Sequence, residues 1–389
     1  MMKPQPDSSR AKFAVGRLVE YLKDDHSGSP AGGDSVPRRL IGVLEGTGIG
    51  PEVISAALQV LAAIEQVLDL KFEVQHGRII SEQAVSPCGK WLSEEVTAFC
   101  ADIFNRGGAI LNGPCGGRYV YDLRRRFDLF CKFVPTRPSP ELLCASRIRS
   151  EFLLGVDILI VRDNTGGVYQ GQWGDRAANK GRLAEHSFSY SEPEVRRIVE
   201  VAARAAANRR GDLHVIVKEG GIPTVSALWA DTGKAVVRQY GIEAKFLNID
   251  LAAYELIQNP KRFDVIVAPN LFGDVIADLG GVLTASRGVT FSGNFNPQGH
   301  GVYQTNHGCA HDLAGRDIAN PAGQILSLAM MLRESFGLFE AAALIETSLA
   351  QVWRKGLRTA DLAEPGCAIV GTKAMADKVA EQVLRSAQA

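Results

Sequence analysis

The feature that most constrains the fold of this chain is the alternation of apolar, strand-like runs with helical periods from Leu40 onward. The run LIGVLEG is followed by PEVISAALQVLAAIEQVL, in which apolar residues recur every three or four positions. Further strand candidates begin near positions 158, 213, 244 and 263, and they read ILIVRD, LHVIVK, AKFLNID and FDVIVAPN. Ser191 and Glu194 form a capping box that predicts the start of a helix. This rhythm predicts an α/β fold with a mainly parallel sheet, and from Asn320 onward the sequence is almost entirely helix-forming.

Residues 1–38 differ in character from the rest of the chain. Apolar residues at positions 13, 15, 18, 19 and 22 predict a short helix within residues 11–23. Residues 26–37 are rich in Gly, Ser and Pro, which is typical of a flexible tether. This extension can be a tail, an interface element or a targeting segment, although its acidic residues argue against an organelle presequence.

Composition excludes several functions. The 389 residues include 43 basic and 43 acidic side chains, so the formal net charge is +0, which argues against a nucleic-acid-binding or membrane-surface protein. No run approaches the roughly 18 to 20 apolar residues of a membrane-spanning helix, so we expect no membrane partner and a cytoplasmic location. The seven cysteines show no CxxC spacing, which favours reduced thiols over a zinc cluster.

The strongest local signal for chemistry is the pair Asp274 and Asp278 in NLFGDVIADLGG. Side chains four residues apart share one face of a helix, and two carboxylates there repel each other unless a cation neutralises them. Mg²⁺ or Mn²⁺ suits such a pair, because hard divalent ions prefer carboxylate oxygens. The alternative is a solvated acidic face, which the apolar and glycine-rich neighbours disfavour.

Other candidate residues lie where predicted strands end. Lys218 and Asp250 follow two strand candidates, and ligands of α/β sheets bind outside the carboxyl ends of the strands. Lys218 suits a substrate cation partner or a proton carrier, although either residue alone is more often an ordinary exposed charge. Tyr169 lies in VRDNTGGVYQG, seven residues after Arg162, and in isolation it reads as a packing residue.

Two glycine-rich segments are candidate ligand loops. Gly46-x-Gly48-x-Gly50 follows an apolar strand, but it lacks the third glycine and the later acidic residue of a dinucleotide-binding fingerprint. A simple strand-to-helix turn is as good a reading as a cofactor contact. The segment from His307 to Gly315 contains two histidines and Asp312 without clean metal-ligand spacing, so a loop that wraps a ligand is more credible than zinc.

In this order, the motifs resemble those of the β-decarboxylating dehydrogenases, which include isopropylmalate, isocitrate, tartrate and D-malate dehydrogenases. The matching stretches are GTGIGPEV at 46–53, VRDNTGGVYQG at 161–171, NLFGDVIADL at 270–279 and HGCAHDLAGRDIANP at 307–321. The resemblance spans residues 39–389 and implies two α/β domains, which differ from the standard Rossmann fold. Residues 39–129 and 285–389 would form the first domain, and residues 130–284 would form the second, with active sites shared across a homodimer.

The resemblance also implies roles for individual residues. The metal would be Mg²⁺ or Mn²⁺ and the cofactor NAD, because Asp312 stands where relatives that use NAD carry an acid. The implied reaction is oxidation of a 2-hydroxy acid followed by loss of CO₂. The carboxylates of the substrate would be bound by Arg124 and Arg162, and the proton chemistry would be done by Tyr169, Lys218 and Asp250. The metal would be bound by Asp250, Asp274 and Asp278, with Lys218 and Asp250 acting in the site of the other subunit. The cofactor loop would be lined by His307, Gly308, Asp312 and Asn320.

The chain departs from the family where relatives hold the substrate. Relatives carry an arginine in an L-R-P triplet, and this chain has Val134 there, which leaves Arg118, Lys132 or Arg137 as possible replacements. The asparagine of the K-x-N motif is replaced by Gly220. We therefore expect a substituted malate other than isopropylmalate or isocitrate, with a polar or anionic distal group bound by Arg118; the alternative is that Arg118 points to solvent, the commoner fate of an isolated arginine. The alternative is a non-catalytic regulatory or binding subunit of the same fold.

Overall fold

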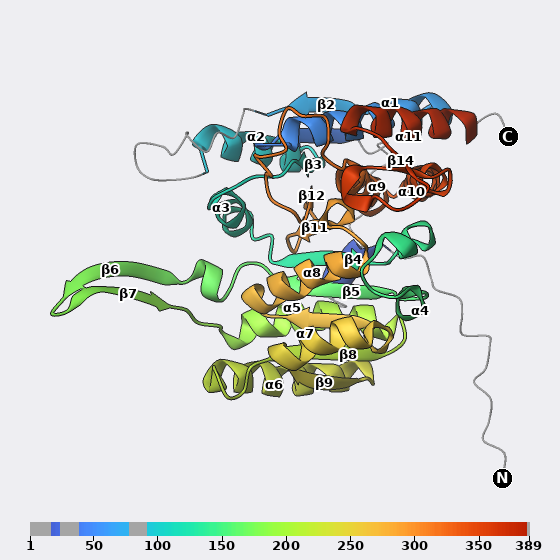
Figure 1. The fold of residues 1–389 in the computed structure, drawn as a ribbon. Coiled ribbons are helices and arrows are strands. Elements are labelled where there is room, and N and C mark those ends of the chain that lie inside the picture. Colours follow the sequence, from blue (N-terminus) through green and yellow to red (C-terminus); the bar gives the residue numbers. More distant parts are fainter. Residues whose placement is uncertain (1–16, 24–38, 78–91, 387–389) are drawn as a thin grey trace, which may run out of the picture.

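The computed structural model describes residues 17–23, 39–77 and 92–386. A ten-stranded mixed sheet runs through the whole molecule in the order β2-β1-β3-β12-β11-β4-β5-β10-β8-β9, with helices on both faces (Figure 1). The strands are β1 (Leu40–Leu44), β2 (Glu73–His76), β3 (Ala109–Asn112), β4 (Cys131–Thr136), β5 (Ile158–Asp163), β6 (Gln172–Ala178), β7 (Gly181–Ser187), β8 (Asp212–Val217), β9 (Glu243–Asn248), β10 (Val265–Ala268), β11 (Phe291–Phe295), β12 (Gly301–Thr305), β13 (Leu357–Arg358) and β14 (Ala368–Ile369). The α-helices are α1 (Gly50–Leu68), α2 (Glu94–Asn105), α3 (Tyr119–Arg126), α4 (Ser150–Leu153), α5 (Glu192–Ala207), α6 (Pro223–Val237), α7 (Ile249–Gln258), α8 (Asn270–Leu283), α9 (Ala322–Glu334), α10 (Phe339–Arg354) and α11 (Thr372–Ser386).

The predicted α/β class and the five predicted strands are confirmed as β1, β5, β8, β9 and β10. Four of these are mostly or fully buried, because a strand covered by helices on both faces is apolar along its whole length. The capping box before α5 is also confirmed, since the Ser191 N–H donates to Glu194 Oε2 over 2.7 Å. Strands β3, β4, β11 and β12 carry no such continuous apolar signal, and the sequence did not predict them.

The two halves of the sheet come from different parts of the chain. Strands β1, β2, β3, β11 and β12 derive from residues before 113 and after 290, whereas β4, β5, β8, β9 and β10 derive from the segment between. Strand β4 joins the halves and is antiparallel to both of its neighbours, β11 and β5. The centre of the molecule is therefore the place where the chain crosses between the halves.

Helix α1 departs from the expectation that no run of the chain approaches the length and apolarity of a membrane-spanning helix. In the described part of the chain it is the one helix that is long and apolar enough to cross a membrane by length and composition. Its apolar side is packed inside the protein, with Val53, Ile54 and Val60 almost completely buried. An apolar helix with that burial is a core helix of an α/β layer.

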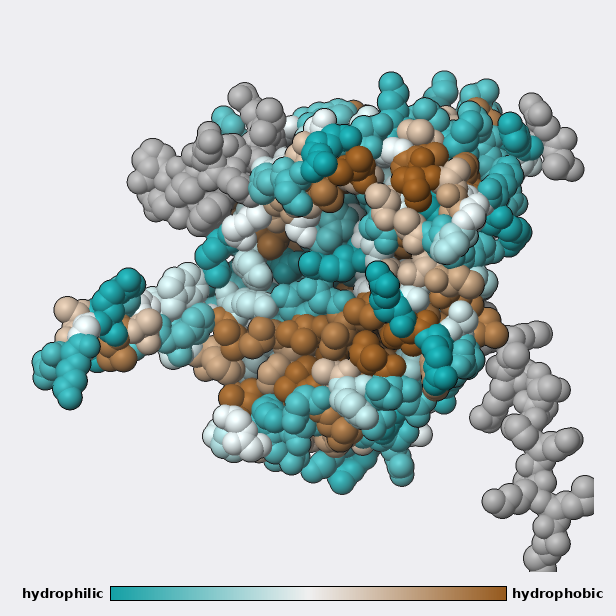
Figure 2. All heavy atoms as spheres, in the orientation of Figure 1, coloured by the Kyte–Doolittle hydropathy of each residue, from teal (hydrophilic) through white to brown (hydrophobic). Residues whose placement is uncertain are grey.

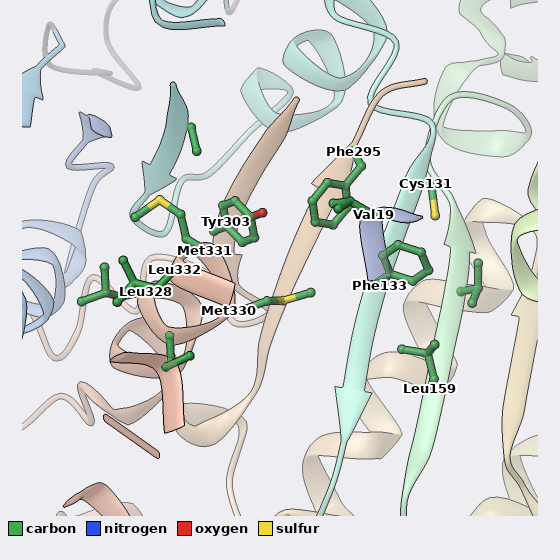
Figure 3. Close-up of a cluster of buried hydrophobic side chains, with 14 of the residues drawn as sticks. Val19, Cys131, Phe133, Leu159, Phe295, Tyr303, Leu328, Met330, Met331 and Leu332 are labelled. Carbon is green, nitrogen blue, oxygen red and sulfur yellow. The ribbon is translucent and has the colours of Figure 1, made fainter. Parts of the chain in front are cut away.

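Within the described part of the predicted N-terminal helix, Leu18–Leu22 form the 3-10 helix η2. Val19 and Leu22 are buried, and Val19 belongs to the same hydrophobic cluster as Phe133 and Phe295 (Figure 3). Arg204 of α5 donates a hydrogen bond to the Tyr21 carbonyl oxygen over 2.7 Å. The predicted tether at 26–37 and the first residues of the predicted helix lie outside the described residues.

Strands β6 and β7 form a separate antiparallel ribbon that projects from the body of the molecule (Figure 1). Every residue of both strands is exposed to solvent. Because an isolated two-stranded ribbon is only marginally stable in water, we expect this arm to pack against another surface.

Candidate active site

Helix α8 carries the acidic pair. Its inner side, with Ile276, Ala277 and Leu283, is buried in a hydrophobic cluster, and the side chains of Asp274 and Asp278 are 37% and 48% exposed. Asp274 forms a salt bridge with Arg162, and Asp278 forms one with Arg287 over 3.1 Å. The pair is thus confirmed to lie on a helix, one turn apart, on a face that solvent and ligands can reach.

The start of α8 is fixed by a buried network. The Tyr190 hydroxyl donates to Asp163 over 3.2 Å and accepts the Asn270 N–H over 2.9 Å. Asn270 also donates to the Gly166 carbonyl oxygen over 3.0 Å. A Cβ atom at Gly167 would lie 2.4 Å from the Tyr190 hydroxyl oxygen, so the glycine pair of VRDNTGGVYQG is needed for this close approach. The network holds the loop before Tyr169 in a fixed position relative to α8.

Arg162 extends from β5 beneath α8. Its Nε and Nη2 atoms donate to Asn270 Oδ1 over 3.2 and 2.8 Å, and its Nη1 atom bonds to Asp274. A Cβ atom at Gly273 would lie 2.7 Å from Arg162 Cγ, so the glycine in NLFGD makes room for the arginine. Although burial opposes ionisation, Arg162, Lys132, Tyr169 and Arg124 lower the pKa of Asp274.

Tyr169 lies against the same carboxylate. Its hydroxyl donates to Asp274 Oδ2 over 3.0 Å. Burial and the charge of Asp274 raise the pKa of Tyr169, so this phenol keeps its proton. The structure therefore brings Tyr169, Arg162 and Asp274 together, as the resemblance implies.

Two further cations lie in this region without a protein anion of their own. Arg124 of α3 and Lys132 of β4 are 5% and 3% exposed. Neither side chain forms a hydrogen bond or an ion pair with any residue in the described ranges, and Arg124 Nε is buried without a partner. Burial and Arg162 lower the pKa of Arg124 to about 10, and burial with both arginines lowers the pKa of Lys132. Buried cations are costly unless an anion neutralises them, so the chemistry of this region suits an anionic ligand.

Arg118 lies at the edge of this region. It donates to the Tyr169 carbonyl oxygen over 3.1 Å and lies over the Trp173 ring at 4.4 Å. Tyr121 faces Tyr169 with ring centroids 5.0 Å apart. Tyr119, the other tyrosine of this segment, points into the core and donates to Asn112, so it does not line the site.

Lys218 and Asp250 form a separate pair. Lys218 Nζ lies 2.8 Å from Asp250 Oδ1, and the Asp250 side chain is 68% exposed. The hydrogen bond from Lys218 lowers the pKa of Asp250. Within the described residues of one chain, no hydrogen bond or ion pair connects this pair to Asp274, Asp278 or Tyr169. Within the described part of one chain, the predicted site residues thus form two groups that no hydrogen bond or ion pair connects.

The predicted cofactor loop packs against the first glycine motif. The Ile49 N–H donates to the Cys309 carbonyl oxygen over 2.9 Å, and a Cβ atom at Gly48 would lie only 2.1 Å from that oxygen. Gly48 has a positive φ of 61°, so glycine is required here for both reasons. The motif therefore serves as a turn that supports the second loop.

Within that loop, His307 faces the acidic helix and Asp312 is exposed. Arg287, Asp361 and Asp278 are electrostatic neighbours of His307, and burial lowers the pKa of this histidine. Gly308 and Asp312 lie on the surface of the loop. Asn320 has an organising role, because its side chain accepts the Ala322 N–H over 3.0 Å and donates to Asp361 over 3.0 Å. The loop reaches from the start of α9 to the edge of the carboxylate site.

Two residues of this site carry chemistry that the sequence reasoning did not assign. Asn270 and Tyr190 are uncharged, and no spacing rule connects them with Asp163, 27 residues before Tyr190. The asparagine that begins the motif NLFGDVIADLGG is the one available signal. Lys132 was considered as a replacement for the missing arginine, but its burial among other cations is visible in the structure alone.

Comparison with known proteins agrees with this arrangement. Residues 40–379 match the isocitrate/isopropylmalate dehydrogenase family. A 3-isopropylmalate dehydrogenase of Burkholderia thailandensis is 39% identical over 360 residues, covering 87% of this chain and 98% of that protein. One of Aquifex aeolicus is 35% identical over 360 residues, covering 89% and 97%. The solved structure of isocitrate dehydrogenase from Methylococcus capsulatus matches with a TM-score of 0.78 and 27% identity, covering 89% of this chain and 99% of that one.

Fold, site and similarity together define the class of this protein, which is a decarboxylating dehydrogenase. The mixed sheet crossed by the chain at its centre is the architecture of the structural relatives. Within that class, the chain belongs to the isocitrate/isopropylmalate dehydrogenase family. The family and the fold predicted from the sequence motifs are therefore confirmed.

Proposed function

We propose that this protein catalyses the NAD- and divalent-metal-dependent oxidative decarboxylation of a 2-hydroxy acid of the substituted malate type. The observation that carries the proposal is the grouping of three buried cations, Arg124, Lys132 and Arg162, beside the half-exposed carboxylates of α8. Arg124 and Lys132, which have no ion pair within the described residues, match the carboxylates of a malate, and the half-exposed carboxylates of α8 match a divalent ion. Figure 2 shows the surface hollowed and hydrophilic between the half that carries α3 and the half that carries α8.

The donor set fits Mg²⁺ or Mn²⁺. Asp274 and Asp278 offer carboxylate oxygens on one exposed helix face, and no three His, Cys, Asp or Glu side chains converge in one chain within the described residues. Two carboxylates with substrate oxygens and one carboxylate from another subunit suit a hard divalent ion, and Asp250 is the candidate for that third ligand. Bound there, such an ion would polarise the substrate hydroxyl and stabilise negative charge on its oxygen.

The protein's own groups have distinct roles in this proposal. Arg124 and Arg162 bind the substrate carboxylates and orient the acid against α8. Lys218, paired with Asp250, accepts the hydroxyl proton in the site of the neighbouring subunit. Tyr169, which holds its proton against Asp274, donates a proton to the carbon that loses CO₂. NAD⁺ supplies the hydride acceptor.

NAD is proposed over NADP because of the 307–320 loop. Asp312 is exposed on this loop, and its position corresponds to the acid that bonds the adenosine ribose in relatives that use NAD. A carboxylate repels the 2′-phosphate of NADP. His307, Gly308 and Asn320 would hold the remaining parts of the loop against the cofactor.

A homodimer with shared active sites is part of the proposal. Four large apolar residues on α7 and α8, Leu251, Tyr254, Val275 and Val282, are at least 39% exposed, and Figure 2 shows hydrophobic surface over this region. The β6–β7 arm is exposed along its whole length. A second copy that covers this face and the arm would bring Lys218 and Asp250 toward the partner's site. Mixing inactive Tyr169→Phe and Lys218→Met subunits should restore activity if the sites are shared.

The cellular location and the division into domains are also part of the proposal. We propose a cytoplasmic enzyme, with residues 39–129 and 285–389 as the cofactor-side domain and residues 130–284 as the inserted domain. The strand origins on the two sides of β4 and β11 support this division.

The substrate is proposed to differ from isopropylmalate and isocitrate. A relative named 3-isopropylmalate dehydrogenase is 39% identical to the chain, so the malate part of the substrate is proposed to be the same in both proteins. Arg118, which lies over Trp173 and donates to the Tyr169 carbonyl oxygen, offers a cation to a polar or anionic distal substituent, whereas a branched alkyl group would gain nothing from this charge.

The test is a turnover assay of the purified full chain with NAD⁺, Mg²⁺ or Mn²⁺ and a panel of malates substituted at the carbon that bears the departing carboxylate. We expect NADH absorbance and released CO₂ in equal amounts with at least one acid, and no signal without metal. Binding of the acids without any turnover would instead support the alternative of a non-catalytic subunit. Retention of the α8 carboxylates, Lys218 and Tyr169 favours the enzyme, because clustered charges are costly in a protein that does not use them.

A further inference from the structure

Lys132 occupies a defined place in the sheet beneath α8. In the register of the central strands it is paired with Arg162 on β5 and with Asn294 on β11. Residues directly opposite each other on antiparallel strands project to the same face of a sheet. Lys132 therefore extends toward the region of Arg162 and the α8 carboxylates, and its electrostatic neighbours are Arg124, Arg162, Asp274 and Asp278.

The environment of Lys132 differs from that of Arg162. Arg162 is satisfied by Asn270 and Asp274, whereas the Lys132 ammonium forms no hydrogen bond or ion pair with a described residue and is 3% exposed. Removing an ammonium from water without a counterion is among the largest penalties in a folded protein. A second cation, Arg124, is buried in the same region and forms no ion pair with any residue that the structure describes. An anionic ligand that contacts both residues removes both penalties.

The position two residues further along the same face of β4 supplies no cation to the site. Val134, where relatives carry an arginine, lies two residues further along the same face of β4. It is 1% exposed and packs in the hydrophobic cluster of Ile158, Ile160 and Ile276. Arg137 is engaged on the surface with Asp157 at 2.8 Å, and Arg118 is stacked on Trp173. Of the three replacements left open by the sequence, Lys132 is the one that is buried beside both Arg124 and Arg162.

We propose that Lys132 is a substrate-binding residue whose ammonium holds a carboxylate of the 2-hydroxy acid in place of the missing arginine. The inference rests on the proposed function. A lysine presents a point charge, whereas an arginine presents two parallel N–H donors that fix the carboxylate plane. The anchor has therefore moved two residues along β4 and has lost its planar geometry, which gives the substrate carboxylate more freedom, while Val134 packs in the hydrophobic cluster.

The experiment compares Lys132→Met and Lys132→Arg with the unmodified full chain. For the acid that the wild-type protein oxidises best, Lys132→Met should raise KM about 10- to 100-fold, the scale of one charge-assisted contact. The KM for NAD⁺ should change little, and Lys132→Arg should recover most of the loss. Lys245→Met is the matched control, because Lys245 pairs with Asp212 on the surface.

A binding measurement separates a ligand contact from a structural role. Malate with Mg²⁺, without NAD⁺, should raise the melting temperature of the wild-type protein and of Lys245→Met, and this rise should be largely lost in Lys132→Met. The melting temperature of Lys132→Met without ligand should be unchanged or higher, because an unpaired buried charge has been removed. If Lys132→Met does not fold, Lys132→Gln tests the same prediction.

The measurements distinguish a failure of the role of Lys132 from a failure of the proposed function. Unchanged KM and an unchanged malate-induced shift in Lys132→Met would overturn the role of Lys132 while leaving the proposed function intact. If the wild-type protein oxidises none of the acids and malate does not stabilise it, the proposed function itself is wrong, and the role of Lys132 falls with it.

Discussion

Glu334 of α9 gives a pH-dependent prediction that can be worked out from the structure. Its side chain is 2% exposed, and Glu334 Oε2 accepts the Val19 N–H of the N-terminal helix η2 over 3.4 Å. Burial raises the pKa of Glu334 from 4.5 to about 7, although the N–H groups of Val19 and Leu18 and the charges of Arg333 and Arg17 oppose this. Tyr21 and Tyr303 are the other titratable groups that interact with this carboxyl.

The sign follows from comparing the folded and unfolded states. Below about pH 4.5 the carboxyl is protonated in both states. Between pH 4.5 and about 7 the unfolded state releases this proton first, so the free energy of unfolding falls as the pH rises. Above about pH 7 the carboxylate is ionised in both states and the full penalty is present. The pKa of Glu334 in the folded state exceeds its ordinary value by about 2.5, which corresponds to a loss of about 3 kcal/mol in the free energy of unfolding at high pH.

Glu334→Gln removes the charge and keeps an oxygen that can accept the Val19 N–H. We expect this variant to be more stable than the wild-type protein by about 3 kcal/mol at pH 8.5 and to match it near pH 4.5. Urea unfolding followed by tryptophan fluorescence across this range measures the difference, and Glu340→Gln, an exposed position on α10, is the control. A difference that does not depend on pH, or a wild-type protein that is more stable at pH 8.5, would refute the reasoning.

Further predictions concern the site and the N-terminal helix. Asp278→Asn should weaken Mn²⁺ binding, measured by titration, by about tenfold or more with little loss of stability; unchanged affinity would remove Asp278 from the metal site. The kcat/KM for NAD⁺ should exceed that for NADP⁺ by about tenfold or more, and equal values would show that Asp312 does not contact the ribose. Arg118→Leu should lower kcat/KM for the preferred acid by about tenfold, whereas efficient oxidation of isopropylmalate by the wild-type protein would contradict the role of this arginine. Val19→Asp should reduce the free energy of unfolding by about 2 to 4 kcal/mol, since it buries an unpaired charge against Phe133; no loss would mean that η2 does not pack there in solution.

The parts of the fold that the sequence predicts are those with a simple period. Strands β5 and β10 are continuous apolar runs, and α1 repeats apolar residues every three to four positions. The arm of β6 and β7 has no such pattern, because both of its faces are exposed in one chain and hydrophobic alternation needs a buried face. In the proposed homodimer the surface that covers this arm belongs to the other subunit, so no local pattern in the chain encodes it.

The residues of the site, like the elements of the fold, can be predicted only where a simple spacing rule applies. Asp274 and Asp278 are four residues apart, and helix geometry alone places them on one face. The contact of Tyr169 with Asp274 joins residues 105 positions apart, and it depends on the Tyr190 network, which no spacing rule describes. The resemblance to family motifs implies that connection, because those motifs summarise a geometry that a single sequence does not contain.

The position of Lys132 shows what a motif can hide. A comparison of motifs registers a lost arginine at Val134, and the simplest reading is one anchor fewer for the substrate. The cross-strand pairing of Lys132 with Arg162 shows that a cation is retained on the same face of the sheet, two residues earlier. Because side chains on a strand alternate between faces, only a shift by an even number of residues keeps a replacement on that face. The distance from Val134 to Lys132 meets this condition, whereas Arg137 lies beyond the end of β4 and is bound to Asp157 at the surface.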